Sequence, residues 1–364
     1  MKNTFDFNGI PQYLDRQMFL DGSVTVQRFD EFRYPKIDQY EKTARGFFWV
    51  PEEIDLTKDK ADFKEATDAI AHCFTSNLLR QTALDSLQGR TPTQIFLPVV
   101  SIPELETLMM NWGFFESNIH SRSYSHIIRN IYNVPKTVFN SIHDTQQIID
   151  MASNVGKYYN ELHRLNCLKE IHPEMVSEED HIDAIWLALH TSYALEALRF
   201  MPSFITSLAM AELKLFIGNG NIISLILQDE VGHRDWTAYI INRVVKDDPR
   251  FAAAKIRCMS RVMQIYKDCV AEEKAWIRFL MSKGSIIGLG VQILDDAMDY
   301  IAGNALKEIG IQYWMSYPKS TPVPWFTKHI EISKKQTALQ ENESTNYIIG
   351  VMSETIDYDS LPDL

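Results

Sequence analysis

Cysteine is scarce in this chain, and its few cysteines form no recognisable motif. The four cysteines among 364 residues, Cys73, Cys167, Cys258 and Cys269, show no C-x-x-C spacing. This excludes a zinc knuckle and gives no sign of a disulfide framework. Because unpaired thiols are typical of a reducing compartment, we expect a cytoplasmic protein, in the host cytoplasm if the source is viral.

Basic residues are outnumbered by acidic ones, and long apolar runs are missing. The chain has 36 Lys and Arg against 48 Asp and Glu, a formal net charge of −12. This balance argues against nucleic acid as a partner, because such binding relies on clustered Lys and Arg. The most apolar later segment, 194–216, is interrupted by four charged residues, so we expect no membrane span and no export signal.

Period-two alternation is rare, whereas apolar residues recur at helical spacing from residue 35 to about residue 310. This pattern predicts an all-α fold with an N-terminal arm (1–34), a helical domain (35–325) whose first helix begins near Pro35, and a flexible tail (326–364). Proline and glycine signals predict breaks at 91–92, 133–135, 171–173, 218–220 and 247–249.

Glu116, His120 and Tyr124 are spaced by four residues, so they lie along one face of a helix, about 5–6 Å apart between neighbouring Cβ atoms. A carboxylate and an imidazole so placed are typical of a metal site, and a neighbouring phenol can take part in redox chemistry. An ordinary amphipathic helix produces the same spacing by chance. The interpretation therefore depends on partners elsewhere in the chain.

Such partners occur in three further segments. Glu230 and His233 stand at i, i+3 after an apolar run, and desolvating this pair is costly unless a cation compensates. Asp85 and Glu196 each lie among leucines. Asp85 precedes Glu116 by 31 residues, about one long helix and a turn. Glu196 precedes Glu230 by 34 residues, so the spacing is repeated.

This repeat predicts two helical hairpins, each giving one carboxylate from its first helix and one carboxylate–histidine pair from its second. Four inward-facing helices with these donors are typical of ferritin-like dinuclear bundles. We therefore predict a ferritin-like helical bundle with extra helices and a dinuclear metal–carboxylate site. Four carboxylates and two imidazoles favour iron or manganese over zinc or copper.

Apolar residues continue along the same helix faces. Phe200 and Phe204 follow Glu196 at i+4 and i+8, and Ile226 lies one turn before the second carboxylate–histidine pair. Ordinary core packing accounts for such residues. They would also enclose Tyr124 in a dry pocket, where a phenoxyl radical formed beside an oxygen-activating metal pair would be protected.

Taken together, these segments resemble the small, radical-generating subunit of class I ribonucleotide reductase over nearly the whole chain. The resemblance rests on these strings and on a tail that contains Tyr347: Phe47-Phe48-Trp49-x-Pro51-Glu52-Glu53, Leu84-Asp85-Ser86-x-Gln88-Gly89-Arg90, Ile119-His120-Ser121-Arg122-Ser123-Tyr124, Ala194-Leu195-Glu196-Ala197-x-Arg199-Phe200 and Asp229-Glu230-x-x-His233.

The resemblance implies a cofactor of two iron ions that react with molecular oxygen, with dimanganese and manganese–iron pairs as alternatives. It also implies a homodimer that converts ribonucleotides to deoxyribonucleotides only together with a large catalytic subunit. One metal would be bound by Asp85, Glu116 and His120, and the other by Glu196, Glu230 and His233.

The resemblance further implies a path for the radical, which Tyr124 would store. The C-terminus of the flexible tail would dock on the large subunit. The residues of the path would be His120, Asp229 and Trp49 in the bundle, followed by Glu341 and Tyr347 in the tail.

One departure from the family pattern falls between Glu116 and His120. The family usually has Glu-x-x-His, whereas this chain has one residue more. Both spacings keep the two ligands on one face, but the extra residue would rotate everything upstream, including Trp112, by about 100°. We therefore predict a single-turn π-bulge near Asn118 that absorbs the insertion.

Two other classes of protein share these ligands. A ferritin-like oxygenase or desaturase would need a substrate channel and no conducting tail. An iron store or a metal-free helical interaction protein would need no protected tyrosine.

Overall fold

The computed structural model describes residues 12–335, which contain no β-strand and are mainly α-helical. Three π-helical segments lie between α-helices: η3 (Pro92–Phe96), η5 (Phe115–His120) and η8 (Leu195–Arg199). The α-helices are α1 (Pro35–Gly46), α2 (Thr57–Glu65), α3 (Asp68–Gln88), α4 (Pro103–Phe114), α5 (Ser121–Ile131), α6 (Pro135–Asn140), α7 (Gln146–Ile171), α8 (Glu178–Ala194), α9 (Met201–Glu212), α10 (Ile217–Asp247), α11 (Pro249–Arg257), α12 (Met259–Leu280), α13 (Val291–Glu308) and α14 (Pro324–Lys335).

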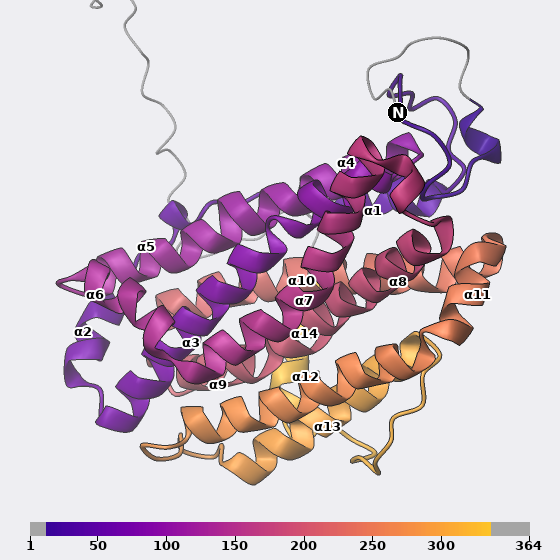
Figure 1. Cartoon of the computed structure of the whole chain (residues 1–364). Coiled ribbons are helices and arrows are strands. Elements are labelled where there is room, and N and C mark those ends of the chain that lie inside the picture. Colours follow the sequence, from indigo (N-terminus) through magenta and orange to yellow (C-terminus); the bar gives the residue numbers. More distant parts are fainter. Residues whose placement is uncertain (1–11, 336–364) are drawn as a thin grey trace, which may run out of the picture.

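The two predicted hairpins form the centre of the bundle. In the first, α3 packs against η5 and α5, which continue α4 without a break. In the second, α10 packs against α8, η8 and α9. Figure 1 shows α4 and α5 end to end along one side of the bundle and α12 and α13 along the opposite side. The all-α fold predicted from the helical periodicity is confirmed, as is the ferritin-like bundle predicted from the spacing of the carboxylates and histidines.

Capping residues explain where several helices begin. Ser177 accepts a hydrogen bond from the Asp180 backbone N–H at the start of α8, and three acidic residues fill its first turn. Asp248 caps α11 in the same way, and Pro249 occupies its first position. The predicted breaks at 133–135, 171–173 and 247–249 fall between helices, and the first helix begins at Pro35.

The predicted break at 218–220 is wrong, because this segment forms the first turn of α10. Glycine is needed there for close packing. A Cβ on Gly218 would lie 2.5 Å from the Asp55 carbonyl oxygen, and one on Gly220 would lie 2.5 Å from the Ala211 Cβ. The buried carboxylate of Asp59 accepts hydrogen bonds from the Gly218 and Asn219 backbone N–H groups, so α2 caps α10 from outside.

The described part of the arm lies on the body of the protein. Phe19 pairs with Val100 in an isolated bridge, and the Leu20 N–H donates to the Val99 carbonyl. At the other end, α14 packs on α10 and its Phe326 is buried. The packed body thus continues past the predicted start of the tail at residue 326, because the apolar face of α14 has a partner.

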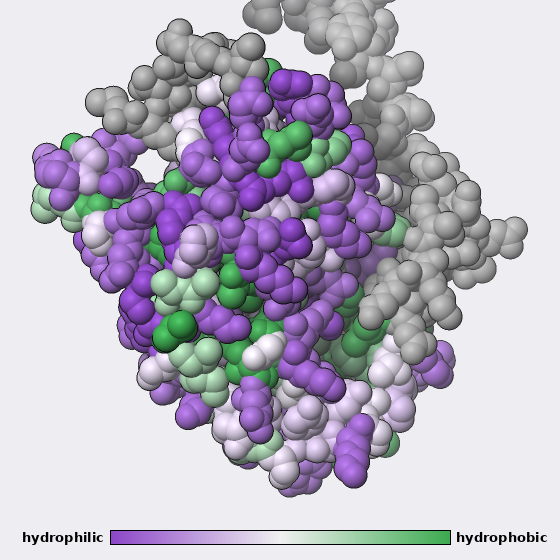
Figure 2. Space-filling model, turned by 90° about the vertical axis from the view of Figure 1, so that its right-hand side faces the viewer, coloured by the Kyte–Doolittle hydropathy of each residue, from purple (hydrophilic) through white to green (hydrophobic). Residues whose placement is uncertain are grey.

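The outer surface is mainly hydrophilic on the face seen in Figure 2, where hydrophobic residues gather in small groups. Within the described residues, no helix is both long enough and apolar enough to cross a membrane.

Candidate metal centre

All six predicted metal ligands meet in the middle of the bundle. Each of the four long helical segments contributes, and every one of these side chains is buried. The ligands are Asp85 on α3, Glu116 and His120 on η5, Glu196 on η8, and Glu230 and His233 on α10.

The first half of the centre is arranged around His120. Its Nδ1 lies 3.2 Å from Glu230 Oε1, 3.5 Å from Glu116 Oε2 and 3.6 Å from Asp85 Oδ1. The ligand atoms of these four residues all lie within 4.8 Å of one another. Such a group is compact enough to surround one cation.

The second half is arranged around His233. Its Nδ1 lies 2.7 Å from Glu230 Oε2, 2.9 Å from Glu116 Oε1 and 3.5 Å from Glu196 Oε2. Glu116 and Glu230 belong to both groups and present one oxygen to each histidine. The geometry therefore gives two adjacent sites that share two carboxylates, a feature that the spacing of the ligands did not reveal.

Several donor atoms of this cluster are buried without a hydrogen-bond partner. They include both oxygens of Asp85, both oxygens of Glu196 and Nδ1 of His120. Unpaired buried carboxylate oxygens are costly, and two divalent cations would balance the four carboxylate charges. The residues therefore fit a pair of divalent metal ions with mainly oxygen ligands, such as iron or manganese.

Burial and mutual contact shift the acidities of the cluster. Burial raises the pKa of Asp85 and of Glu196 well above the usual carboxyl value. Burial alone would lower the pKa of the imidazoles, but the surrounding carboxylates, Glu230 foremost, raise the pKa of His120 and His233 well above the usual value. The metal-free cluster thus retains protons that cations would replace.

The predicted π-bulge is confirmed. Residues 115–120 form the π-helical segment η5, which includes both Glu116 and His120. Ser117 and Asn118 are exposed, so the extra residue is accommodated on the outer side while Glu116 and His120 are buried. Trp112 Nε1 donates a hydrogen bond to Glu116 Oε1 over 3.1 Å. Through this contact, the face of α4 that carries Trp112 keeps its orientation toward the cluster despite the inserted residue.

A second π-helical segment, η8, carries Glu196, and no feature of the sequence indicated it. At its end, Arg199 Nη1 lies 2.6 Å from Glu272 Oε2 and 3.5 Å from Glu273 Oε1. The fully buried Glu273 also pairs with Arg80 on α3. An ion network thus fixes η8 against two neighbouring helices.

Tyr124 is completely buried, one helical turn beyond His120. Its hydroxyl has no hydrogen-bond partner among the described residues. Burial, followed by the charges of Asp85 and Glu230, raises the pKa of this phenol well above its usual value. Tyr124 therefore keeps its proton at neutral pH.

The predicted pocket residues Phe200, Phe204 and Ile226 are also fully buried. The two phenyl rings stack with their centroids 5.2 Å apart. Their enclosure of Tyr124 stays a prediction.

The other predicted residues of the radical path fall into two groups. Trp49 Nε1 donates to Asp229 Oδ2 over 2.9 Å, and His120 Nε2 lies 3.0 Å from the same oxygen. A carboxylate that accepts from His120 Nε2–H leaves Nδ1 free for a metal. Glu341 and Tyr347 lie outside the described residues.

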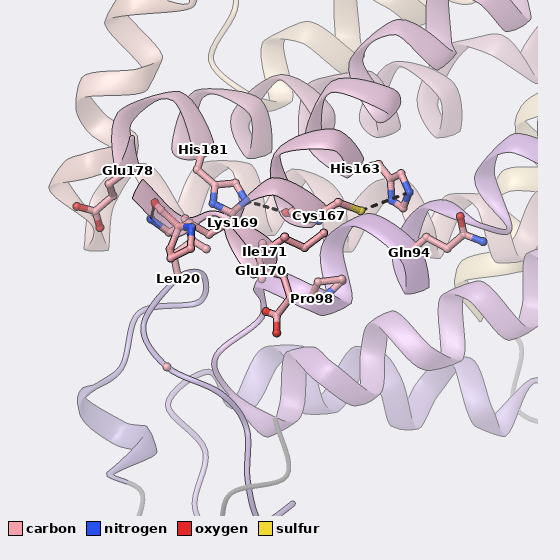
Figure 3. Close-up of a pocket in the computed structure, with 14 residues that line it drawn as sticks. Leu20, Gln94, Pro98, His163, Cys167, Lys169, Glu170, Ile171, Glu178 and His181 are labelled. Carbon is pink, nitrogen blue, oxygen red and sulfur yellow. Dashed lines mark hydrogen bonds between the residues drawn. The ribbon is translucent and has the colours of Figure 1, made fainter. Parts of the chain in front are cut away.

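A cavity of about 820 Å³ is separate from this cluster. Figure 3 shows it between the arm and the end of α7, where His181 bonds to Asn166 and Cys167 contacts His163. None of the six cluster residues lines it. This cavity therefore gives no substrate channel to the carboxylates.

The four-helix core and the paired carboxylate–histidine groups define a ferritin-like protein with a dinuclear metal–carboxylate site. A family model described as "Ribonucleotide reductase, small chain" matches residues 27–322. The chain belongs to this family. That membership favours ribonucleotide reduction over the oxygenase and iron-store hypotheses.

Two relatives extend the match over nearly the full length. The ribonucleoside-diphosphate reductase subunit beta of Buchnera aphidicola subsp. Acyrthosiphon pisum is 37% identical over 356 residues, covering 94% of each chain. The subunit of the same name from Haemophilus influenzae is 36% identical over 372 residues, covering 99% of this chain and 98% of the relative.

Solved structures share the fold at low sequence identity. The ribonucleotide reductase R2 subunit from Clostridium botulinum has a TM-score of 0.75 and 19% identity, covering 86% of this chain and 94% of that one. The dimanganese(II)-NrdF from Streptococcus sanguinis has a TM-score of 0.68 and 17% identity, covering 84% of this chain and 99% of that one.

Proposed function

We propose that this small subunit of ribonucleoside-diphosphate reductase generates and stores a radical on Tyr124 and passes it to the large subunit, which reduces ribonucleotides to deoxyribonucleotides. The observation that carries the proposal is the position of Tyr124. Its buried hydroxyl, without a hydrogen-bond partner, lies close enough to the cluster for the Asp85 charge to raise its pKa. A phenol so placed can be oxidised and then protected from water.

Two metal ions are proposed as the cofactor. Once bound, they would supply the redox chemistry that uses molecular oxygen to oxidise the tyrosine. We propose iron, and manganese is the alternative because the oxygen-rich donor set accepts both metals. We propose that the ions are held by Asp85, Glu116 and His120 on one side and by Glu196, Glu230 and His233 on the other, with Glu116 and Glu230 shared.

The chain's own residues would then direct the radical. Asp229 accepts from both Trp49 and His120, so it connects the buried indole to the first metal position. We propose that electron transfer leaves the bundle along this hydrogen-bonded path. Glu341 and Tyr347 are proposed to continue it into the large subunit.

The remaining proposals concern partners and location. We propose that the chain acts as a homodimer, docks on the large subunit through its C-terminus, and works in the cytoplasm.

The first test loads the metal-free protein with ferrous iron, or with manganese, in the presence of oxygen. Electron paramagnetic resonance of the iron-loaded wild type is expected to reveal a phenoxyl signal that Tyr124→Phe abolishes. Tyr159→Phe is the matched control, because Tyr159 is also buried but bonds to Gln88 and Ser192. A radical that persists in Tyr124→Phe, or no radical with either metal, would reject the assignment.

A further inference from the structure

A second, smaller cavity lies away from the metal cluster, where α8, α10, α11 and α12 meet the segment after α13. Its volume is about 220 Å³, and none of the six cluster residues lines it. Buried apolar side chains, among them Ile241, Val262 and Ile309, form much of its wall. The cavity has the size of a small molecule and a largely apolar lining.

Two polar groups in this wall are buried without a partner. Trp186 and His190, one turn apart on α8, are 3% and 1% exposed. Their rings meet edge to face with centroids 4.3 Å apart. Trp186 Nε1 and His190 Nε2 form no hydrogen bond within the described structure. Both residues are among those that line the cavity, and buried polar groups are nearly always paired, so a ligand there is a candidate partner for them.

The hydrogen bond at the other side of the imidazole indicates what that ligand must offer. His190 Nδ1 lies 2.7 Å from the buried hydroxyl of Tyr266. If Tyr266 donates to Nδ1, the Tyr266 hydroxyl and His190 Nδ1 each have a hydrogen-bond partner, and the ring proton resides on Nε2. Burial, reinforced by the charge of Lys255, lowers the pKa of His190 to about 3, so the ring is neutral. Both unpaired atoms are then N–H donors that need an acceptor.

The charges around the cavity are of one sign. Lys246 and Lys255 line it, and no acidic side chain is among the lining residues in the described part of the chain. Asn242, the other polar residue there, already donates its amide to the Glu308 carbonyl. Two neutral donors and two ammonium groups favour an anion, while the apolar wall favours hydrocarbon.

We propose that this cavity binds a small organic carboxylate. Its oxygens accept hydrogen bonds from Trp186 Nε1 and His190 Nε2 close to the Lys255 ammonium, and its hydrocarbon part lies against the apolar wall. Inorganic phosphate can accept the two hydrogen bonds but has no hydrocarbon part to contact the apolar lining. A neutral amide of the same shape can contact the apolar lining but has no negative charge to interact with the lysine ammonium groups.

The test follows indole N–H resonances of the full-length chain, labelled with ¹⁵N-tryptophan, during titration with butyrate. Trp186→Phe assigns the reporter signal. The Trp276 indole, which is bonded to Ser203 Oγ, is an internal reference. Butyrate is expected to shift the Trp186 signal to saturation and to leave the Trp276 signal in place, whereas equimolar butyramide produces little shift.

Lysine variants give the second readout. Lys255→Met is expected to weaken butyrate binding about tenfold, the effect of one charge-assisted contact. Lys267→Met, which changes an exposed lysine on α12 outside the cavity, should leave binding unchanged. The proposal is overturned if butyrate produces no saturable shift, if butyramide or inorganic phosphate shifts the signal equally, or if both lysine variants bind alike.

Discussion

The two helical hairpins supply matching carboxylate and histidine side chains to the cluster, but their histidines have different surroundings. His120 in the first hairpin is joined through Asp229 to Trp49 by hydrogen bonds. The ring of His233 in the second hairpin lies instead against two indoles, with centroids 5.7 Å from Trp112 and 4.7 Å from Trp236. One half of the centre is connected outward through polar contacts, and the other half is packed among aromatic rings.

The π-helical segments of the two hairpins are also held differently. In the first hairpin, Ser117 Oγ donates a single hydrogen bond of 3.0 Å to the Gly89 carbonyl. In the second, Arg199 joins a buried network with Glu273 and Arg80. The same helical distortion is therefore fixed by a neutral contact near the surface in one case and by buried charge in the other.

The largest expected effect is on the charged network. Glu273→Gln removes the carboxylate between two buried guanidinium groups and should lower the free energy of unfolding by about 3 kcal/mol. Glu272→Gln is the matched variant, because this side chain is 20% exposed and bonds only one of the two arginines, Arg199. It should cost less than about 1 kcal/mol. Urea unfolding of the two variants measures the difference, and equal losses would contradict the distinction.

The next prediction compares the effect on turnover of a change near His120 with that of a change near His233. Trp49→Phe removes the N–H that donates to Asp229 and should reduce ribonucleotide turnover with the large subunit on the order of 10–100-fold, with the Tyr124 radical still formed. Trp236→Phe alters the packing around His233 and should leave turnover near the wild-type value. Turnover and electron paramagnetic resonance are measured on the same samples. Equal loss of turnover in both variants would remove the proposed difference between the two halves.

A pH experiment compares two buried histidines of the second hairpin. Neighbouring carboxylates raise the pKa of His233 against the effect of burial, whereas burial lowers the pKa of His190 to about 3. Below about pH 6.5 the unfolded chain binds a proton on His190 and the folded chain does not. The free energy of unfolding therefore decreases as the pH is lowered through that range. At pH 5 the loss is about 2 kcal/mol.

His190→Gln retains a partner for Tyr266 but does not titrate. The difference in unfolding free energy between pH 7 and pH 5 should therefore be about 2 kcal/mol smaller in the variant than in the wild type. Parallel losses in the two proteins would mean that His190 is charged in the folded state.

The cluster of six buried residues was predictable because each member is a polar residue at a position where helical periodicity demands an apolar one. Glu196 among leucines and Glu230 after an aliphatic run both break a pattern. The π-bulge at η5 was predictable for a related reason, since an extra residue between two ligands of fixed direction has to be absorbed locally. Both predictions depended on a conflict that is visible within one helix.

What could not be predicted depends on contacts between helices. The sharing of Glu116 and Glu230 by both sites follows from the distance between the hairpins, which residue spacing does not contain. The segment η8 has ordinary helix-forming residues, and its π-helical form accompanies the pairing of Arg199 with α12. Gly218 suggested a break because glycine is typical of turns. The reason for glycine at this position is its close approach to the Asp55 carbonyl, a tertiary contact that the sequence does not reveal.

The smallest expected effect concerns the neutral contact that holds η5. Ser117→Ala removes the hydrogen bond to the Gly89 carbonyl and should lower the free energy of unfolding by about 1 kcal/mol. Asn118→Ala, at the neighbouring exposed position, should change it by less than about 0.5 kcal/mol. Because both changes lie on the outer side of η5, metal content should be retained in both variants. If Asn118→Ala cost as much as Ser117→Ala, the inserted residue itself, and not the bond to Gly89, would stabilise the π-helical turn.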